Sequence, residues 1–292
     1  MKILSFDIEE WYIYKSTHGE SEEMFNKYDK ILGNILDLLD EKGCKATFFC
    51  VGRMADDFPQ VVKLIYARGH EIGCHSNTHT WLNKMTFEEC MDDTRTAIDS
   101  LQQCIGEKVK SYRAPAFSIG KSNKWAFDIL AECGIEYDSS VYPATRDFGG
   151  FSDFGANEPV KVKHGNTVIK EFPIAMTQLL GRKMAYSGGG YFRFFPLWYI
   201  RREMENAPYS ISYFHIDDLL VEQNKPMSRE EYEEYFKEPG TVIARYKRYI
   251  KANLGKAKAW PKLVKLIGNN DYLSIEQAGR AIPWGSVSNI EL

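Results

Sequence analysis

The chain has 292 residues, of which 44% are hydrophobic, 14% aromatic and 26% charged, and its formal net charge is -3. These are ordinary values for a globular protein, and without a positive excess nucleic acid is not an expected partner. No apolar run approaches the roughly 18 residues of a membrane-spanning helix, and the opening MKILSFDIEEW lacks the apolar stretch of a secretory signal. The sequence therefore predicts a cytoplasmic protein without a transmembrane segment and leaves its oligomeric state open.

Six cysteines occur without any CxxC or zinc-finger spacing, and in a chain of this length we expect them to be free thiols. Cys74 precedes His75, but the favoured interpretation is a buried strand residue.

Short apolar runs typical of strands alternate with helical patterns along the chain. We expect strands over residues 2–8, 46–52, 70–76, 110–117, 135–142, 167–175 and 209–216. We expect helices ending at Gly43, over 59–69, over 86–103, over 123–133 and beginning at Pro196. The third of these helices opens with a capping box of Thr86 and Glu89.

This alternation predicts an α/β fold in which parallel strands are joined by right-handed crossovers. About seven repeats favour closure into a (β/α) barrel, here placed in residues 1–222. Residues 143–166 are rich in Gly, Pro and Asp and read as a long loop, and residues 181–195 also interrupt the pattern. Residues 223–292 are charged and predict a helical C-terminal extension packed on the barrel.

Polar residues stand at or near the carboxyl ends of five predicted strands, where barrel enzymes carry their chemistry. They are Asp7, His75, Arg113, Asp138 and His215. We expect them to converge on one rim.

His75 and His79 are four residues apart in HSNTH, a spacing that places two imidazoles on one side of a turn or tight loop. Imidazole is a common ligand of zinc-like ions, although two polar loop residues are the alternative. Asp7 and Glu9 are expected on one face of a strand, where a cation would compensate two like charges. Glu9 would complete a set of two imidazoles and one carboxylate that leaves positions open for water and substrate.

Arg113 beside a carboxylate would lower its pKa and fix its orientation, whereas an isolated Arg113 would be a surface residue. His215 follows an apolar strand, a position that suits a general acid. For His215 alone, a rim histidine without chemistry is the favoured interpretation.

Together, FDIEE, GHEIGCHSNTH, RAPAF and YSISYFHIDD resemble, in order and spacing, the four motifs of the polysaccharide deacetylases of NodB-homology type, carbohydrate esterase family 4. The resemblance covers roughly residues 1–220 and also includes ATFFCVG. The pieces DIEEW, YDSSVYP, EFPIA and SGGGYFR resemble a subgroup from bacterial exopolysaccharide and capsule gene neighbourhoods, and the tail resembles its C-terminal extension.

The resemblance implies a distorted barrel and a role for each matching residue. Asp7 would be the catalytic base, Glu9, His75 and His79 the metal ligands, Arg113 the residue that orients the base, and His215 the general acid. Pro115 belongs to the Arg-x-Pro motif, and the Ala116 N–H corresponds to an oxyanion donor. The chain departs from the usual adjacent aspartates, so Glu10 is an alternative ligand if a bulge intervenes. The family's Asp-Trp motif is not evident, and Asp138 is the candidate for supporting Arg113 or His215.

The expected activity is metal-dependent hydrolysis of an N-acetyl group on an acetamido sugar, in a polysaccharide or a sugar-linked precursor. The expected cofactor is one divalent ion, with zinc first and cobalt, nickel or manganese as alternatives. Tyr191 and Arg193 are candidates for stacking on a sugar and holding a phosphate, with simple packing as the alternative. A ureide or amide hydrolase is the alternative enzyme, and the replacement of the usual aspartate by Glu9 keeps open an inactive sugar-binding member.

Overall fold

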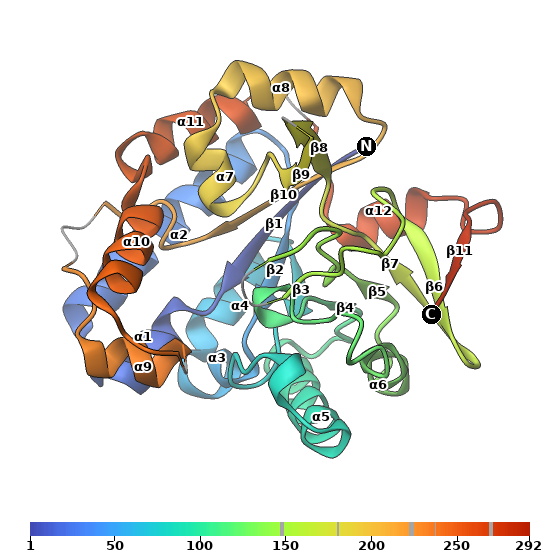
Figure 1. The fold of residues 1–292 in the computed structure, drawn as a ribbon, viewed down its shortest axis with the longest axis horizontal. Coiled ribbons are helices and arrows are strands. Elements are labelled where there is room, and N and C mark those ends of the chain that lie inside the picture. The colour runs from blue at the N-terminus through green and yellow to red at the C-terminus, as the bar shows by residue number, and fades with distance from the viewer. Residues whose placement is uncertain (147–148, 180, 222–224, 237, 269–270) are drawn as a thin grey trace.

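The computed structural model describes all residues except 147–148, 180, 222–224, 237 and 269–270. Its main feature is a nine-stranded sheet with the order β10-β1-β2-β3-β4-β5-β7-β6-β11, surrounded by helices (Figure 1). Seven neighbouring strands are parallel: β10 (Ser210–His215), β1 (Lys2–Ile8), β2 (Thr47–Cys50), β3 (Glu71–Cys74), β4 (Ser111–Tyr112), β5 (Tyr137–Asp138) and β7 (Thr167–Glu171). These are the seven predicted strands, so the predicted parallel α/β architecture is confirmed.

Two further strands extend the sheet beyond β7. β6 (Val160–His164) pairs antiparallel with β7, and β11 (Asn289–Glu291) pairs parallel with β6. β6 lies inside the predicted loop 143–166, so that prediction is wrong for these residues. The sequence VKVKH alternates apolar and polar residues, and its apolar Val160 and Val162 are buried as expected for a half-buried strand.

The helices that cross between strands follow the predicted positions. They are α2 (Glu22–Glu41), α4 (Pro59–Ala67), α5 (Phe87–Ile105), α6 (Ala126–Glu132) and α8 (Leu197–Asn206). The predicted capping box at Thr86 and Glu89 is present at the start of α5. Helices α1 (Glu10–His18), α3 (Gly52–Asp57) and α7 (Gly189–Phe194), and the hairpin of β8 (Met176–Leu179) and β9 (Arg182–Ala185), were not predicted.

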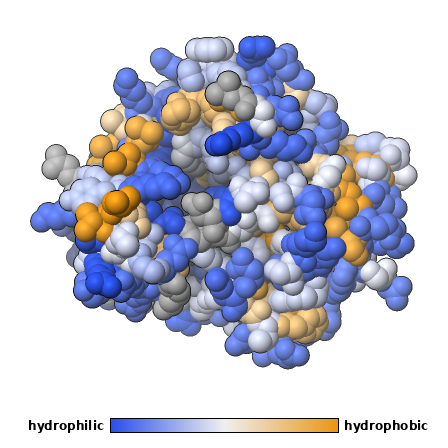
Figure 2. Space-filling model, viewed as in Figure 1, coloured by the Kyte–Doolittle hydropathy of each residue, from blue (hydrophilic) through white to orange (hydrophobic). Residues whose placement is uncertain are grey.

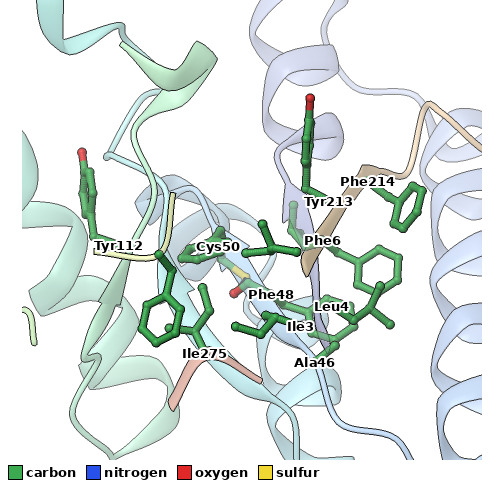
Figure 3. Packing of buried hydrophobic residues seen from close by; sticks show 14 of the residues in the cluster. Ile3, Leu4, Phe6, Ala46, Phe48, Cys50, Tyr112, Tyr213, Phe214 and Ile275 are labelled. Carbon is green, nitrogen blue, oxygen red and sulfur yellow. Dashed lines mark hydrogen bonds between the residues drawn. The ribbon is translucent and has the colours of Figure 1, made fainter. Parts of the chain in front are cut away.

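The C-terminal part contains α9 (Arg229–Phe236), α10 (Val242–Asn253), α11 (Ala259–Ile267), α12 (Ile275–Ala281) and β11. The predicted domain boundary at 222/223 lies outside the described residues. The tail is not wholly helical, because β11 joins the main sheet and Leu273 exchanges backbone hydrogen bonds with Lys2 and Leu4 beside β1. Ile275 of α12 belongs to the same core cluster as Ile3 and Leu4 (Figure 3).

The core lies between the sheet and its helices and is aromatic at its centre. Phe6 of β1 stacks on Phe48 of β2 at 5.0 Å between ring centroids and contacts Phe214 of β10 at 5.8 Å (Figure 3). The six cysteines are all described and none forms a disulfide, as predicted. In the described part of the chain, no helix has the length and apolar character needed to cross a membrane.

Candidate active site

The polar residues predicted at the strand ends gather at the carboxyl edge of the sheet. Asp7 and His215 are direct partners across the parallel pair β1 and β10. His75 follows the last residue of β3, and Arg113 follows the last residue of β4. The shared polarity of parallel strands therefore brings these four side chains to one rim.

Glu9, His75 and His79 each direct one donor atom to a common point. Oε2 of Glu9 lies 3.3 Å from Nε2 of His75 and 2.7 Å from Nε2 of His79, and one such atom from each residue lies within 4.8 Å of the others. Ligand atoms about 2.0–2.2 Å from a tetrahedral zinc ion are roughly 3.3 Å apart. The three residues thus fit a divalent ion and leave a further position open.

The ring of His75 is oriented by the backbone of the Arg-x-Pro segment. Its Nδ1 lies 2.7 Å from the carbonyl oxygen of Arg113, and because a carbonyl only accepts, Nδ1 carries the proton. Nε2 therefore faces Glu9 and is available as a ligand, an arrangement typical of metal-binding histidines.

The loops that carry these residues have unusual backbone conformations. Among the described non-glycine residues, those with positive φ are Ser76 (59°), His79 (58°), Ala116 (54°) and Phe117 (54°). Such conformations cost free energy and cluster at functional sites. Asp93 of α5 stabilises the histidine loop by accepting the Asn77 N–H at 2.9 Å.

Glu9 and Glu10 differ in position and in protonation. The prediction that Asp7 and Glu9 share a strand face is wrong, because β1 ends at Ile8 and Glu9 is the N-cap of α1. Burial opposes the charge of Glu9, but the charges of His79 and His215 and the close imidazoles of His75 and His79 hold its pKa well below its usual range.

Glu10 is turned away from the histidine pair. Its Oε1 accepts the Asp217 N–H at 2.9 Å, and this contact ties the start of α1 to the segment after β10. Burial and the neighbouring charge of Glu9 raise the pKa of Glu10 to about 8. Glu9, rather than Glu10, is thus the carboxylate placed to bind a cation, and its ligand role remains a prediction.

Asp7 is oriented by Arg113, a fully buried guanidinium. Nη1 of Arg113 donates to Oδ1 of Asp7 at 2.8 Å and to Oγ of Ser5 at 2.9 Å. The guanidinium lies over the ring of Phe49, 4.3 Å from its centroid. The other oxygen of Asp7 remains directed to the site, 3.7 Å from Nε2 of His215.

His215 is supported by Asp218, a residue that the sequence reasoning missed. Oδ2 of Asp218 accepts the His215 backbone N–H at 3.0 Å and lies 3.2 Å from Nδ1 of its ring. Burial opposes a charge on His215, but Glu9, Asp218 and Asp7 outweigh it and raise the pKa of His215 well above its usual value. In the sequence, the role of Asp218 is indicated by its position three residues after His215 in HIDD. This spacing is too common to identify one aspartate.

Arg193 of α7 lies behind this pair, and its predicted contact with substrate stays a prediction. Its Nε is 3.1 Å from Oδ1 of Asp218, and both side chains are buried. A role for Arg193 in holding Asp218 therefore fits the geometry better than a contact with phosphate.

Asp138 forms no hydrogen bond or ion pair with Arg113 or His215 in the described structure. Its Oδ1 accepts the hydroxyl of Ser140 at 2.5 Å, and Ser140 in turn accepts the Ala114 N–H at 2.8 Å. Burial raises the pKa of Asp138. Burial and the charge of Asp138 raise the pKa of Glu171. Asp138 supports the Arg113 segment through the backbone, and the residue beside His215 is Asp218.

The Arg-x-Pro segment continues into a short 3-10 helix, η2 (Pro115–Phe117). Among the described residues no hydrogen bond of the Ala116 N–H is recorded, and its role as an oxyanion donor stays a prediction. Pro115 is buried and fixes the start of the turn.

Two tyrosines border the site. Tyr191 of α7 shares a side-chain hydrogen bond with Tyr142, whose ring packs on Phe117 of η2 at 5.7 Å. Tyr235 of α9, which was not predicted, lies near enough to Glu9 to sense its charge. Burial of its hydroxyl and the charge of Glu9 raise the pKa of Tyr235.

The arrangement combines three residues that could hold a cation with an oriented carboxylate and an oriented imidazole. The carboxylate of Asp7 is placed to accept a proton from water, and His215 is placed to donate one across the same space. These groups suit hydrolysis of an acyl bond.

Two family profiles match consecutive parts of the chain. Residues 24–137 match the polysaccharide deacetylase family, and residues 139–279 match DUF3473, a domain of unknown function. The chain is 37% identical over 93 residues to a peptidoglycan-N-acetylglucosamine deacetylase of Bacillus cereus, which covers 32% of this chain and 34% of that protein. It is 26% identical over 98 residues to a chitooligosaccharide deacetylase of a Bradyrhizobium species, covering 34% and 42% of the two chains. The chain therefore spans about a third to two fifths of the length of these relatives.

A solved structure shares the fold over nearly the whole length. A chain from Mycobacterium smegmatis assigned as a polysaccharide deacetylase aligns with a TM-score of 0.64 at 16% identity, covering 100% of this chain and 92% of that one. The distorted barrel expected from the sequence is the fold of this family. Residues 24–137 therefore form a polysaccharide deacetylase domain of NodB or carbohydrate esterase 4 type, and residues 139–279 match a DUF3473 domain.

Proposed function

We propose that this protein is a metal-dependent deacetylase that hydrolyses the N-acetyl group of an acetamido sugar in a polysaccharide or its precursor. The observation that carries the proposal is the meeting of the Glu9, His75 and His79 donors with the Asp7–Arg113 pair and His215 on one rim. The named activities of the curated relatives, on peptidoglycan and on chitooligosaccharides, support an acetylated amino sugar as substrate.

Glu9, His75 and His79 would hold the ion, zinc by preference and cobalt, nickel or manganese as alternatives. When bound, such an ion polarises water and the acetamide carbonyl. Asp7, oriented by Arg113, takes the proton of the attacking water. The Ala116 N–H donates to the carbonyl oxygen as it gains negative charge. His215, oriented by Asp218, donates a proton to the leaving sugar amine, and acetate is released.

The test is acetate release from chitooligosaccharides and peptidoglycan fragments by the purified protein. We expect activity that is lost with a chelator and restored by zinc, and an Asp7→Asn variant that keeps its metal and loses at least about 10²-fold in rate. Acetate release that is unaffected by Asp7→Asn would contradict the assignment of the base.

The replacement of the usual aspartate by Glu9 is the observation behind an alternative, an inactive sugar-binding member. Glutamate still offers a carboxylate oxygen to the histidine pair, which favours an active enzyme. A protein that contains no metal and is not activated by zinc or cobalt would instead support the binding role. Release of ammonia or an amine from cyclic amides or ureides, without acetate release from sugars, would identify the other alternative.

A further inference from the structure

Helix α10 turns charged side chains toward the protein and apolar side chains outward, the reverse of an ordinary surface helix. None of its twelve residues is buried, and its arginines face the protein. Arg245 donates to the carbonyl oxygen of Met227 at 2.9 Å. Arg248 donates to the hydroxyl of Tyr232 at 3.1 Å and lies over the ring of Phe236, 4.0 Å from its centroid. The arginine side of α10 thus contacts the rest of the protein, and its apolar side faces outward.

The outward side of α10 carries an apolar stripe with helical spacing. Its residues and their exposed fractions are Val242 (60%), Ile243 (81%), Tyr246 (52%), Ile250 (59%) and Leu254 (53%). Leaving this many large apolar side chains in water is unfavourable, and such patches mark interaction surfaces.

The stripe ends beside two more exposed aromatic residues. Arg193 of α7 donates to the carbonyl oxygens of Lys251 and Ala252, so the end of α10 is held against α7. Phe194 and Trp198 follow in sequence and are 65% and 66% exposed. We call these two residues together with the stripe the α10 patch. Figure 2 shows hydrophobic side chains gathered over α10 and next to its end toward α7.

The chain segment that carries the stripe is opposite in net charge to the rest of the chain, whereas the neighbouring α9 carries Glu230, Glu231, Glu233 and Glu234. Residues 242–268 contain eight Lys or Arg and no Asp or Glu, whereas the remaining residues have 29 basic and 40 acidic side chains. Lys247, Lys258 and Lys265 are exposed. An apolar stripe with aromatic residues and flanking lysines suits the interface of an anionic bilayer, into which apolar side chains insert while lysines meet lipid phosphates.

We propose that the α10 patch docks this protein on the surface of an anionic lipid bilayer. Two features favour a bilayer as the binding partner. One is charge complementarity, and the other is that the surface is a single helix with its apolar side outward. The same Arg193 that holds α10 also pairs with Asp218 behind His215, so the docked surface is joined directly to the candidate active site. The proposal does not depend on deacetylase activity, because binding is measured without a sugar substrate.

The experiment is flotation of the full chain with vesicles of phosphatidylethanolamine and phosphatidylglycerol, compared with vesicles of pure phosphatidylcholine. We expect binding to the anionic vesicles that weakens as salt is raised to about 0.5 M, since salt screens surface charges. The double variant Ile243→Glu/Ile250→Glu should lower the bound fraction at least about tenfold. Lys247→Glu/Lys258→Glu should lower it and remove the preference for anionic lipid.

The matched control is Leu64→Glu/Val168→Glu, which replaces exposed apolar residues on α4 and β7 (42% and 52% exposed) and should bind like the unchanged protein. Thermal melts confirm that each variant is folded. Failure of the unchanged protein to float with anionic vesicles would overturn the proposal. So would binding that the Ile243/Ile250 variant retains, or a dimer seen by light scattering that this variant dissociates, since a second copy would then cover the patch.

Discussion

Glu9 and Glu10 are adjacent in the chain, yet their carboxylates point to different partners. Glu9 meets the two imidazoles, whereas Glu10 holds the backbone of Asp217. We predict that Glu9→Ala lowers zinc affinity by more than the 10- to 100-fold that loss of an outer partner typically costs. Glu10→Gln keeps an acceptor for Asp217 and should retain the metal. Elemental analysis after incubation with zinc measures both, and equal zinc content in the two variants would contradict the assignment of Glu9.

Asp218 orients His215 without reaching the rim itself. We predict that Asp218→Asn lowers kcat about 10- to 100-fold with little change in KM, because the proton donor is misplaced while the sugar contacts remain. His215→Ala should cost about 10²–10⁴-fold, the usual contribution of a general acid. Steady-state kinetics at equal metal content checks both, and an unchanged kcat for Asp218→Asn would assign Asp218 a purely structural role.

Some of these residues could be predicted from the sequence and others could not, for a physical reason. The motif residues Asp7, His75, Arg113 and His215 were found because strand polarity places them on one rim. The order of charged groups behind the rim was not predictable, because Asp218 and Arg193 meet only through the packing of α7 on the end of β10. Asp138 was the candidate for supporting Arg113 or His215, but its carboxylate accepts the hydroxyl of Ser140.

At the scale of elements, α12 shows how closely the C-terminal part packs on the barrel. A Cβ at Gly279 would lie 2.3 Å from the ring of Tyr137 in β5, whereas one at Gly33 in α2 would meet nothing within 4 Å. We predict that Gly279→Ala lowers the free energy of unfolding by about 1–3 kcal/mol through overpacking. Gly33→Ala, the matched control, should raise it by roughly 0.5–1 kcal/mol. Urea unfolding measures both, and a stabilising Gly279→Ala would show that α12 is not held against β5.

His70, at the start of β3, predicts a pH dependence of stability. Burial, with the charges of Lys45 and Arg68, lowers the pKa of His70 to about 4, while the unfolded value is about 6.5. The unfolded chain binds more protons between these values, so this contribution to stability falls as the pH drops from about 6.5 toward 4, by at most about 3 kcal/mol.

His70→Phe keeps an aromatic contact with Phe48, 5.2 Å away between centroids, and removes the titration. We expect a flatter dependence of the free energy of unfolding on pH than in the unchanged protein. Unfolding titrations across this range give the comparison, and parallel curves would refute the buried neutral state of His70.

The parallel strands and the long crossover helices were predictable because their hydrophobic period follows from one-sided or complete burial. The short elements were not. α1 begins at Glu10, with Glu9 as its N-cap directly after β1, and its position depends on the hydrogen bonds of Glu10 with Asp217 and of Trp11 with Asp29. β11 has three residues, and only its pairing with β6 defines it as a strand.

At the scale of the whole molecule, the site does not belong to one matched segment. Asp7 and Glu9 precede both family matches, the histidine pair and Arg113 lie in the polysaccharide deacetylase match, and His215 lies in DUF3473. The barrel thus closes its rim with residues of the second segment. This explains why the fold was predictable from alternating elements, whereas the support of His215 by Asp218 in the second segment was not.

The packing of the C-terminal part on the rest of the chain predicts the effect of truncation. Residues beyond 225 contribute buried side chains to the common core, among them Leu263, Leu266 and Ile275, and Leu273 pairs with the backbone beside β1. A chain that ends at residue 221 should therefore lose cooperative unfolding and aggregate, because it exposes this core surface. A chain that ends at residue 287 loses only the edge strand β11 and should fold. Near-UV circular dichroism and thermal melts measure the outcome, and a native-like melt of the shorter chain would instead make residues 1–221 an independent domain.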